Sequence, residues 1–451
     1  MNNYIEIILI LVILLLTWNI WLNSYFMYLR LPIRIQRQLK KKRRSRMICI
    51  IDSLFSILVI PLSYIVPKKK NLILFMGRQN SGFLDNVKYL YIYLYEHHYN
   101  EKYDIIFVGH NDISLEQLNA VGFKTINYRP SIKVYGLLLR ANLIITDNAH
   151  WTTHNRYNAA LKAKKIQLWH GIGFKNIRLT DEKFRKAAHS IKGFFSHRLT
   201  GQLAIYDLFL STSKFYTDKV FAPSFLPKEF FVCGYPRNDV FLQETLFLEE
   251  HKLINVDVPV YEKIKSLKQQ GKKIILYTPT FRKARQYNIS EEFLNFSMLS
   301  DFGESINAVF VFKLHPLPKY NIDFSLYNNV IEYNNRKDVY PLFKYADLLI
   351  TDYSSIYMDY LLLDRPCLFF IYDFNYYIQS CRGVMHDIMD SAPGEKCKNQ
   401  EELHNQLYQI LVEHIDLWAD QRKKVRDMAW EYQEGNSCQK AWDYISSKYL
   451  L

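Results

Sequence analysis

Residues 347–373, DLLITDYSSIYMDYLLLDRPCLFFIYD, decide the fold. Two apolar runs, LLIT and CLFF, flank the segment SSIYMDYLLL, which has the apolar residues and the polar opening of a helix. Asp352 or Ser354 is placed to cap that helix, and Pro366 opens the second run. A strand, a helix and a strand in this order predict a parallel sheet, because parallel strands need a long crossover between them.

The same alternation extends over most of the chain. Apolar runs that are typical of strands buried on both faces occur at 71–77, 103–109, 142–148, 165–171, 207–213, 230–236, 272–280, 308–316, 347–355 and 366–373. Segments with helical length and pattern occur at 85–98, 132–140 and 401–431. A charged stretch, 243–270, separates the first six runs from the last four. The pattern therefore predicts two α/β units.

We expect two doubly wound, Rossmann-like domains at 71–250 and 271–451, preceded by a separate segment, 1–70. The total of 451 residues is too long for one ordinary core. In open α/β sheets, ligands bind at the carboxyl ends of the strands. Two such domains would place those ends face to face across a cleft.

The amino-terminal segment predicts membrane attachment. The segment 5–29 is long and apolar enough to cross a bilayer. No basic region precedes it and no small-residue cleavage site follows it, which favours an uncleaved anchor over a signal peptide. Nine Lys or Arg residues follow between Arg30 and Arg46, and the positive-inside rule places them, with the body, in the cytoplasm. The second apolar stretch, 47–66, contains Asp52 and Pro61. We interpret it as a helix in the plane of the cytoplasmic leaflet, with a buried core helix as the alternative.

Charge and missing motifs narrow the function further. The formal net charge of +14 favours anionic partners, and the concentration of basic residues beside the apolar segments indicates a membrane surface rather than nucleic acid.

The six cysteines form no CxxC pair, so neither a metal site nor a disulfide framework is predicted. Neither GxxxxGK[ST] nor GxGxxG follows a strand, which disfavours P-loop hydrolysis and the usual dinucleotide site. The sequence requires no cofactor.

Polar residues that could carry chemistry follow four of the predicted strands. They are His170 and Gly171, then Thr280 and Arg282, then Lys313 and His315, then Asp352, Ser354 and Ser355. Each taken alone is more often a cap or turn residue, but four such strand ends in one chain favour a site. The helix start after Asp352 suits a pyrophosphate, because its N–H groups and dipole attract anions.

Five ordered motifs resemble one known family. LWHGIGFKNI, GYPRNDVF, LYTPTFR, FKLHP and TDYSSIYMDYLLLDRPCLFF are similar to those of the CDP-glycerol glycerophosphotransferases of teichoic acid and capsule synthesis. The stretch GRQNSGFLDNVKYLYIYL also looks like the opening strand and helix of that family, with Asp85 and Asn86 in the usual place. The resemblance covers about 71–373. It implies a GT-B fold and transfer of glycerol phosphate from CDP-glycerol to a lipid-linked acceptor, with release of CMP.

The resemblance also implies roles for individual residues. His170 would be the base on the acceptor hydroxyl, which suits a side chain that titrates near neutral pH. His315 would contact the donor phosphates, and Asp352, Ser354 and Ser355 would lie at the donor site. Further substrate-binding candidates are Trp169, Gly171, Thr280, Arg282, Lys313 and Arg237. For Arg237, a salt bridge to Asp239 or packing between the domains are open alternatives.

One departure from the family pattern bears on the acceptor. Ile172 and Gly173 stand where the family commonly has Thr and Pro, so this loop is where the acceptor's identity would be decided.

Other functions stay open at this stage. A transferase using CDP-ribitol, or a GT-B glycosyltransferase using a nucleotide sugar, would keep the fold and change the donor. A membrane adaptor that binds anionic polymer through the basic segment would be no enzyme. The two histidines at strand ends argue against the adaptor. The partners expected are CDP-glycerol, a lipid-linked glycerol phosphate acceptor and an anionic membrane surface.

Overall fold

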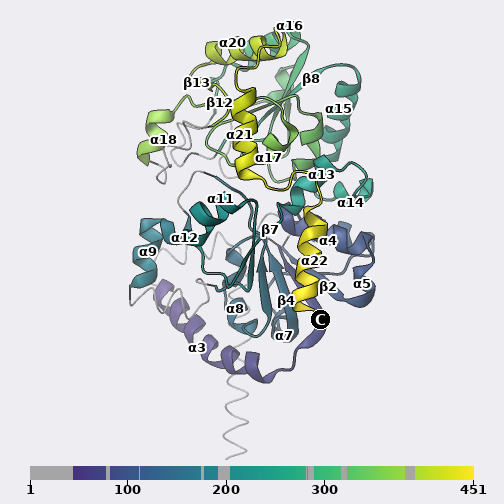
Figure 1. The fold of residues 1–451 in the computed structure, drawn as a ribbon, viewed down its shortest axis with the longest axis vertical. Helices are drawn as coiled ribbons and strands as arrows, with labels where there is room; N and C mark the ends of the chain where they lie inside the picture. The colour runs from purple at the N-terminus through teal and green to yellow at the C-terminus, as the bar shows by residue number, and fades with distance from the viewer. Residues whose placement is uncertain are drawn as a thin grey trace, which may run out of the picture.

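The computed structural model forms two lobes stacked along the long axis of the molecule (Figure 1). It describes residues 44–77, 82–110, 112–173, 177–190, 204–280, 282, 289–315, 322–380 and 392–450. The predicted anchor, 5–29, lies outside these residues, as does most of the basic run after it.

The first lobe is built on a seven-stranded parallel sheet in the order β3-β2-β1-β4-β5-β6-β7. Its strands are β1 Lys69–Met76, β2 Asp104–Gly109, β3 Thr125–Asn127, β4 Ala141–Thr146, β5 Lys164–Gln167, β6 Leu208–Ser211 and β7 Phe230–Val232. The inner strands are apolar on both sides because helices cover both faces of a parallel sheet. Strand β6, for example, is buried at all four positions.

The second lobe contains a six-stranded parallel sheet in the order β10-β9-β8-β11-β12-β13. Its strands are β8 Lys273–Tyr277, β9 Ala308–Phe312, β10 Val330–Glu332, β11 Leu348–Thr351, β12 Cys367–Phe370 and β13 Lys396–Cys397. All ten apolar runs predicted as strands contain one, so the prediction of two parallel α/β units is confirmed. The three strands that the prediction missed, β3, β10 and β13, have only two or three residues each, too few for a pattern.

Helices connect these strands and cover the sheets. The longer ones are α3 Arg44–Ile65, α4 Asp85–Glu96, α6 Asp112–Ala120, α7 Ile132–Arg140, α9 Glu182–His189, α15 Val258–Gln269, α16 Phe296–Ser305, α20 Gln400–Leu411, α21 Ala419–Ala429 and α22 Ser437–Tyr449. The helix predicted after Ser354 is short. It comprises α17, Ile356–Tyr360, and continues as a 3-10 turn, Leu361–Leu363.

The last helix, α22, leaves the second lobe and packs on the first (Figure 1). Asp239 of the first lobe accepts hydrogen bonds from the backbone N–H groups of Ser437 and Cys438, at 3.0 and 2.7 Å. Farther along the helix, the Tyr444 ring stacks on Phe231 with a centroid distance of 3.9 Å. The predicted range of the second domain, 271–451, thus includes a helix that packs on the other domain.

Helix α3 lies along the outer end of the first lobe, away from the second (Figure 1). Phe55 and Val59 are buried in a cluster with helix α7, and Ser56 donates to Asn155. The stretch 47–66 is therefore helical, as predicted, and one face of it packs on the protein. Among the described residues, no helix combines the length and the apolar character needed to span a membrane.

Candidate active site

His170 follows strand β5 in a loop whose backbone is held from two sides. Trp169 has a φ of +56°, an unusual conformation for a large side chain. Its N–H donates to the Gln167 side-chain oxygen at 3.0 Å, and its carbonyl accepts from the Asn86 side chain at 2.9 Å. Residues held in such conformations cluster at functional sites, where the surrounding structure fixes them. The loop thus presents the next residue, His170, in a defined position.

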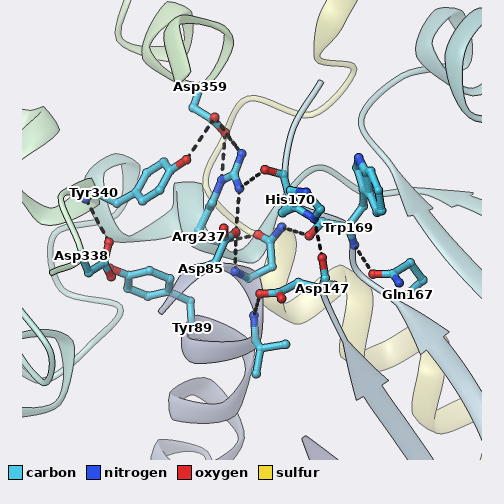
Figure 2. Close-up of polar contacts among 12 residues, drawn as sticks. Asp85, Tyr89, Asp147, Gln167, Trp169, His170, Arg237, Asp338, Tyr340 and Asp359 are labelled. Carbon is cyan, nitrogen blue, oxygen red and sulfur yellow. Dashed lines mark hydrogen bonds and ion pairs between the residues drawn. The ribbon is translucent and has the colours of Figure 1, made fainter. Parts of the chain in front are cut away.

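The surroundings of His170 determine which ring nitrogen carries the proton. Its Nδ1 lies 2.6 Å from the carbonyl oxygen of Asp147, at the end of strand β4 (Figure 2). A carbonyl can only accept a hydrogen bond, so Nδ1 must donate. The neutral ring then has its lone pair on Nε2, the form that a general base needs. The ring is half-buried and lies against Trp169, with 4.2 Å between centroids.

The two lobes meet directly at the loop that follows His170. A Cβ atom added to Gly171 would lie 2.8 Å from Ser355 Oγ, and one added to Gly173 would lie 2.9 Å from Ser355 Cβ. Ser355 stands at the start of helix α17 in the second lobe. The carboxyl ends of β5 and β11 therefore lie together, as the sequence predicted for a site built by both domains.

Substituting Gly173 tests this close approach. Gly173→Ala should lower activity by ~10-fold to ~100-fold, because displacing reacting groups by about 1 Å has effects of that size. Ser355→Gly removes the opposing Cβ, so adding Gly173→Ala to a Ser355→Gly background should cause little further loss. Gly136 of α7 is the matched control, since a Cβ there meets nothing within 4 Å. Equal activity in Gly173→Ala and wild type would contradict the contact.

Arg237 lies at the centre of a polar network between the lobes (Figure 2). Its Nη1 donates to Asp85 at 2.6 Å and to the His170 carbonyl at 2.8 Å. Its Nη2 and Nε donate to Asp359 of α17, at 2.8 and 3.2 Å. Asp239, the alternative partner, instead caps α22. Burial disfavours the charged guanidinium, but Asp359 and Asp85 outweigh this and raise the pKa of Arg237 well above its usual value.

Arg282 is likewise buried and paired. It donates to Asp352 at 2.8 Å and to Asp373 at 2.9 Å, with about 1% of its side chain exposed. Asp352 also accepts the backbone N–H of Thr280, at 2.9 Å. Asp352 therefore braces the loop after strand β8, while Ser354 accepts the N–H of Ile356 at 3.4 Å. Neither of the two predicted caps stands at the cap position of α17, which is Ser355, and the Ser355 side chain makes no capping hydrogen bond.

Five predicted donor-site residues remain partly exposed at the carboxyl ends of the second sheet: Thr280, Lys313, His315, Ser354 and Ser355. Lys313 and His315 follow strand β9. The Lys313 Nζ lies 3.2 Å from the carbonyl oxygen of Asn335, and burial lowers the pKa of this lysine to about 8, against the opposing effect of Asp338. These residues present a cation and polar donors, which suits phosphate groups.

Sequence reasoning gave no role to several residues that position the site. Asp147 acts through its backbone carbonyl, for which no residue type is diagnostic. Asp359 had a usable signal, because it is a carboxylate inside the otherwise apolar helix YMDYLLL. Asp85 and Asn86 were noted only through the family resemblance.

No metal site emerges from the described residues, where no three His, Cys, Asp or Glu side chains gather as metal ligands would. A surface pocket of about 410 Å³ lies at the outer edge of the first sheet, beside β3 and α7. None of the candidate site residues lines this pocket, so we assign it no part in the site.

Two Rossmann-like lobes that meet at the carboxyl ends of their strands, with polar side chains gathered there, place the chain in the GT-B-like class of folds. A family model described as "CDP-Glycerol:Poly(glycerophosphate) glycerophosphotransferase" matches residues 58–447. The chain belongs to this family, and the resemblance drawn from its motifs is confirmed.

Known proteins similar to this chain agree with that assignment. A teichoic acid poly(glycerol phosphate) polymerase of Bacillus spizizenii is 27% identical over 383 residues, covering 80% of this chain and 88% of its own length. A teichoic acid glycerol-phosphate primase of Bacillus subtilis is 29% identical over 321 residues, covering 70% and 76%. The solved structure of the wall teichoic acid polymerase TagF has the same fold. Its TM-score is 0.67 at 20% identity, over 92% of this chain and 98% of that one.

Proposed function

We propose that this chain transfers glycerol phosphate from CDP-glycerol to a hydroxyl of a membrane-linked acceptor and releases CMP. The observation that carries the proposal is the Nδ1 contact of His170, which puts the lone pair of the neutral ring on Nε2, in the loop where both lobes meet. The family match supports the donor. The two relatives described above are named for glycerol phosphate and are 27% and 29% identical, whereas relatives named for ribitol phosphate that match most of this chain are 23% and 24% identical, so we propose glycerol.

In the proposed reaction, the acceptor oxygen attacks the phosphorus that bears the glycerol. His170 Nε2 takes the proton of the hydroxyl as the new P–O bond forms. The bond from that phosphorus to the bridging oxygen breaks, and CMP leaves with the electron pair. Charge on the transferred phosphoryl oxygens must be stabilised, and we assign this task to His315, Lys313 and the serines before α17.

The pH dependence of kcat/KM should report the protonation of Lys313. Its pKa of about 8 lies below the usual value for a lysine, so the free enzyme loses this cation as the pH rises through about 8. A protonated lysine favours bound phosphates, so kcat/KM for CDP-glycerol should fall on the alkaline side, with an apparent pKa near 8. Lys313→Arg should move this limb to higher pH, because arginine stays protonated.

Lys68 provides the control for that profile. Its pKa is also lowered to about 8, through burial and then through Lys162, but it lies beside α3 and donates to the Leu139 carbonyl. Lys68→Arg should leave the alkaline limb in place. A limb that moves in Lys68→Arg and stays in Lys313→Arg would contradict the assignment to Lys313.

A comparison of donors tests the proposed function. Membranes containing the full chain are supplied with a lipid-linked glycerol phosphate acceptor and with CDP-glycerol, CDP-ribitol or a nucleotide sugar, and release of the nucleotide is followed. We expect release of CMP from CDP-glycerol. Faster release from CDP-ribitol would make the chain a ribitol-phosphate transferase. A response only to the nucleotide sugar would make it a glycosyltransferase, and no turnover of any donor would favour the adaptor.

We also propose that α3 lies on the cytoplasmic leaflet, with both lobes in the cytoplasm. Its outer face carries a stripe of exposed apolar side chains: Leu54, Ile57, Leu58, Leu62 and Ile65, which are 42–75% exposed. Exposed lysines, Lys69 and Lys70, follow directly. An apolar stripe with adjacent cations suits an anionic lipid surface.

Photocrosslinking tests this placement in the full chain. Benzoylphenylalanine at Ile57 or Ile65 should form adducts with labelled phospholipid in vesicles containing phosphatidylglycerol. The same probe at Leu417, an 83% exposed leucine of the second lobe, should form none. Equal labelling at Ile57 and Leu417 would exclude a specific role for α3.

A further inference from the structure

Arg237 has no donor left for a substrate. All three guanidinium nitrogens donate to Asp85, Asp359 or the His170 carbonyl, and only about 2% of the side chain is exposed. The rings of Tyr235 and Tyr340 flank it, each with its centroid 4.9 Å from the guanidinium carbon. A buried arginine with its fork filled holds a structure together and does not bind a phosphate.

The partners of Arg237 come from three parts of the chain that must be aligned for reaction. Asp85 begins α4 of the first lobe, the His170 carbonyl belongs to the loop of the base, and Asp359 belongs to α17 of the second lobe. Asp359 lies one helical turn after Ser355, the residue that packs on the base loop. One side chain therefore contacts both the base loop and the helix that faces it.

The backbone beside Arg237 strengthens this link. Asn86 accepts a hydrogen bond from the Arg237 N–H at 3.1 Å, and its amide donates to the Trp169 carbonyl at 2.9 Å. Asn86 is fully buried, so both contacts are made without competition from water. Arg237 and Asn86 thus hold two successive carbonyl groups of the base loop, those of Trp169 and His170.

From this geometry we infer that Arg237 is a positioning residue that couples docking of the second lobe to alignment of His170. When α17 docks, Asp359 fixes one side of the guanidinium, and the other side fixes the His170 carbonyl. Separation of the lobes would remove the Asp359 contact and release the base loop. The inference rests on the proposed function, because it assigns His170 as the base.

A second contact between the lobes supplies a matched control. Lys88 of α4 is buried and pairs with Asp338 of the second lobe at 2.9 Å, with 0% and 2% of the two side chains exposed. It comes from the same helix as Asp85 and Asn86, and its Nζ donates to Asp338, which Figure 2 shows, and to the Lys252 carbonyl. Loss of Lys88 therefore weakens the joint between the lobes and removes none of the contacts to the base loop described above.

The test compares Arg237→Met, Arg237→Lys, Asp359→Asn and Lys88→Met in steady-state release of CMP by the full chain. We expect Arg237→Met to lower kcat by ~100-fold, with KM for CDP-glycerol changed by less than about threefold, because misalignment affects the transition state. Asp359→Asn should also lower kcat, because it weakens the contact between Arg237 and α17. Arg237→Lys keeps the charge without the fork and should recover part of the loss. Lys88→Met should keep kcat within about threefold of wild type.

Hydrogen exchange separates failure of this inference from failure of the proposed function. Exchange at residues 168–173 should be faster in Arg237→Met and Asp359→Asn than in wild type, and unchanged in Lys88→Met, whether or not a donor is turned over. If Arg237→Met does not fold, Arg237→Lys and Asp359→Asn carry the same comparison. Raised KM with unchanged kcat would make Arg237 a donor-binding residue. Equal losses of kcat in Arg237→Met and Lys88→Met would make it a tether between the lobes. Either result overturns the inference.

Discussion

His170→Gln lowers kcat for CMP release by ~10²-fold to ~10⁴-fold, the range that a positioned general base contributes. The reason lies in the ring's tautomer. The backbone carbonyl of Asp147 accepts a hydrogen bond from Nδ1, with 2.6 Å between nitrogen and oxygen, so Nε2 is the nitrogen that takes the acceptor's proton. Glutamine has a similar reach but no basic nitrogen. Steady-state kinetics with CDP-glycerol and the lipid-linked acceptor measure the effect.

Two observations distinguish loss of the base from loss of the fold. The melting temperature should stay close to wild type, because His170 is only half-buried and its backbone contacts to Arg237 persist in the variant. The acid limb of the pH profile of kcat/KM should also disappear, since that limb reports protonation of the base. A variant with kcat unchanged would refute the assignment.

His315→Ala should lower kcat/KM for CDP-glycerol by ~10²-fold to ~10³-fold, as expected for removal of one group that stabilises transition-state charge. His315 follows strand β9 and is partly exposed, on the lobe that carries Lys313 and the serines. Unlike His170→Gln, this variant should also weaken binding of CDP-glycerol measured without acceptor. Unchanged donor affinity and unchanged kcat/KM would remove His315 from the donor site.

His404 serves as the control histidine. It lies on α20 and stacks on Phe302, with 4.2 Å between ring centroids, and burial lowers its pKa to about 4. The helix is on the outer side of the second sheet (Figure 1). His404→Ala should therefore leave kcat/KM for CDP-glycerol near the wild-type value.

The alternation of strands and helices could be predicted because most of the strands correspond to local apolar runs in the sequence. Strand β9, AVFVF, is buried at all five positions, and such a run has few other interpretations. Strand β13, with two residues, leaves no comparable signal. The position of α22 on the first lobe also could not be predicted, since it depends on Asp239, 199 residues before Cys438.

The site could be predicted in part. Strand-end motifs located His170, His315 and the serines correctly at the ends of strands, because topology fixes where those ends lie. Whether an arginine faces substrate or protein depends on distant partners. Arg237 pairs with carboxylates 152 residues before it and 122 residues after it, and no local pattern reveals either one.

The most direct test of the account is the mass of the lipid product. Wild-type protein, incubated with CDP-glycerol and a lipid-linked glycerol phosphate acceptor, should lengthen the acceptor by whole glycerol phosphate units and release one CMP for each unit added. The His170→Gln variant should form neither product at a comparable rate. CMP without an equal amount of lengthened lipid, or a product that carries anything but glycerol phosphate, would contradict the proposed transfer.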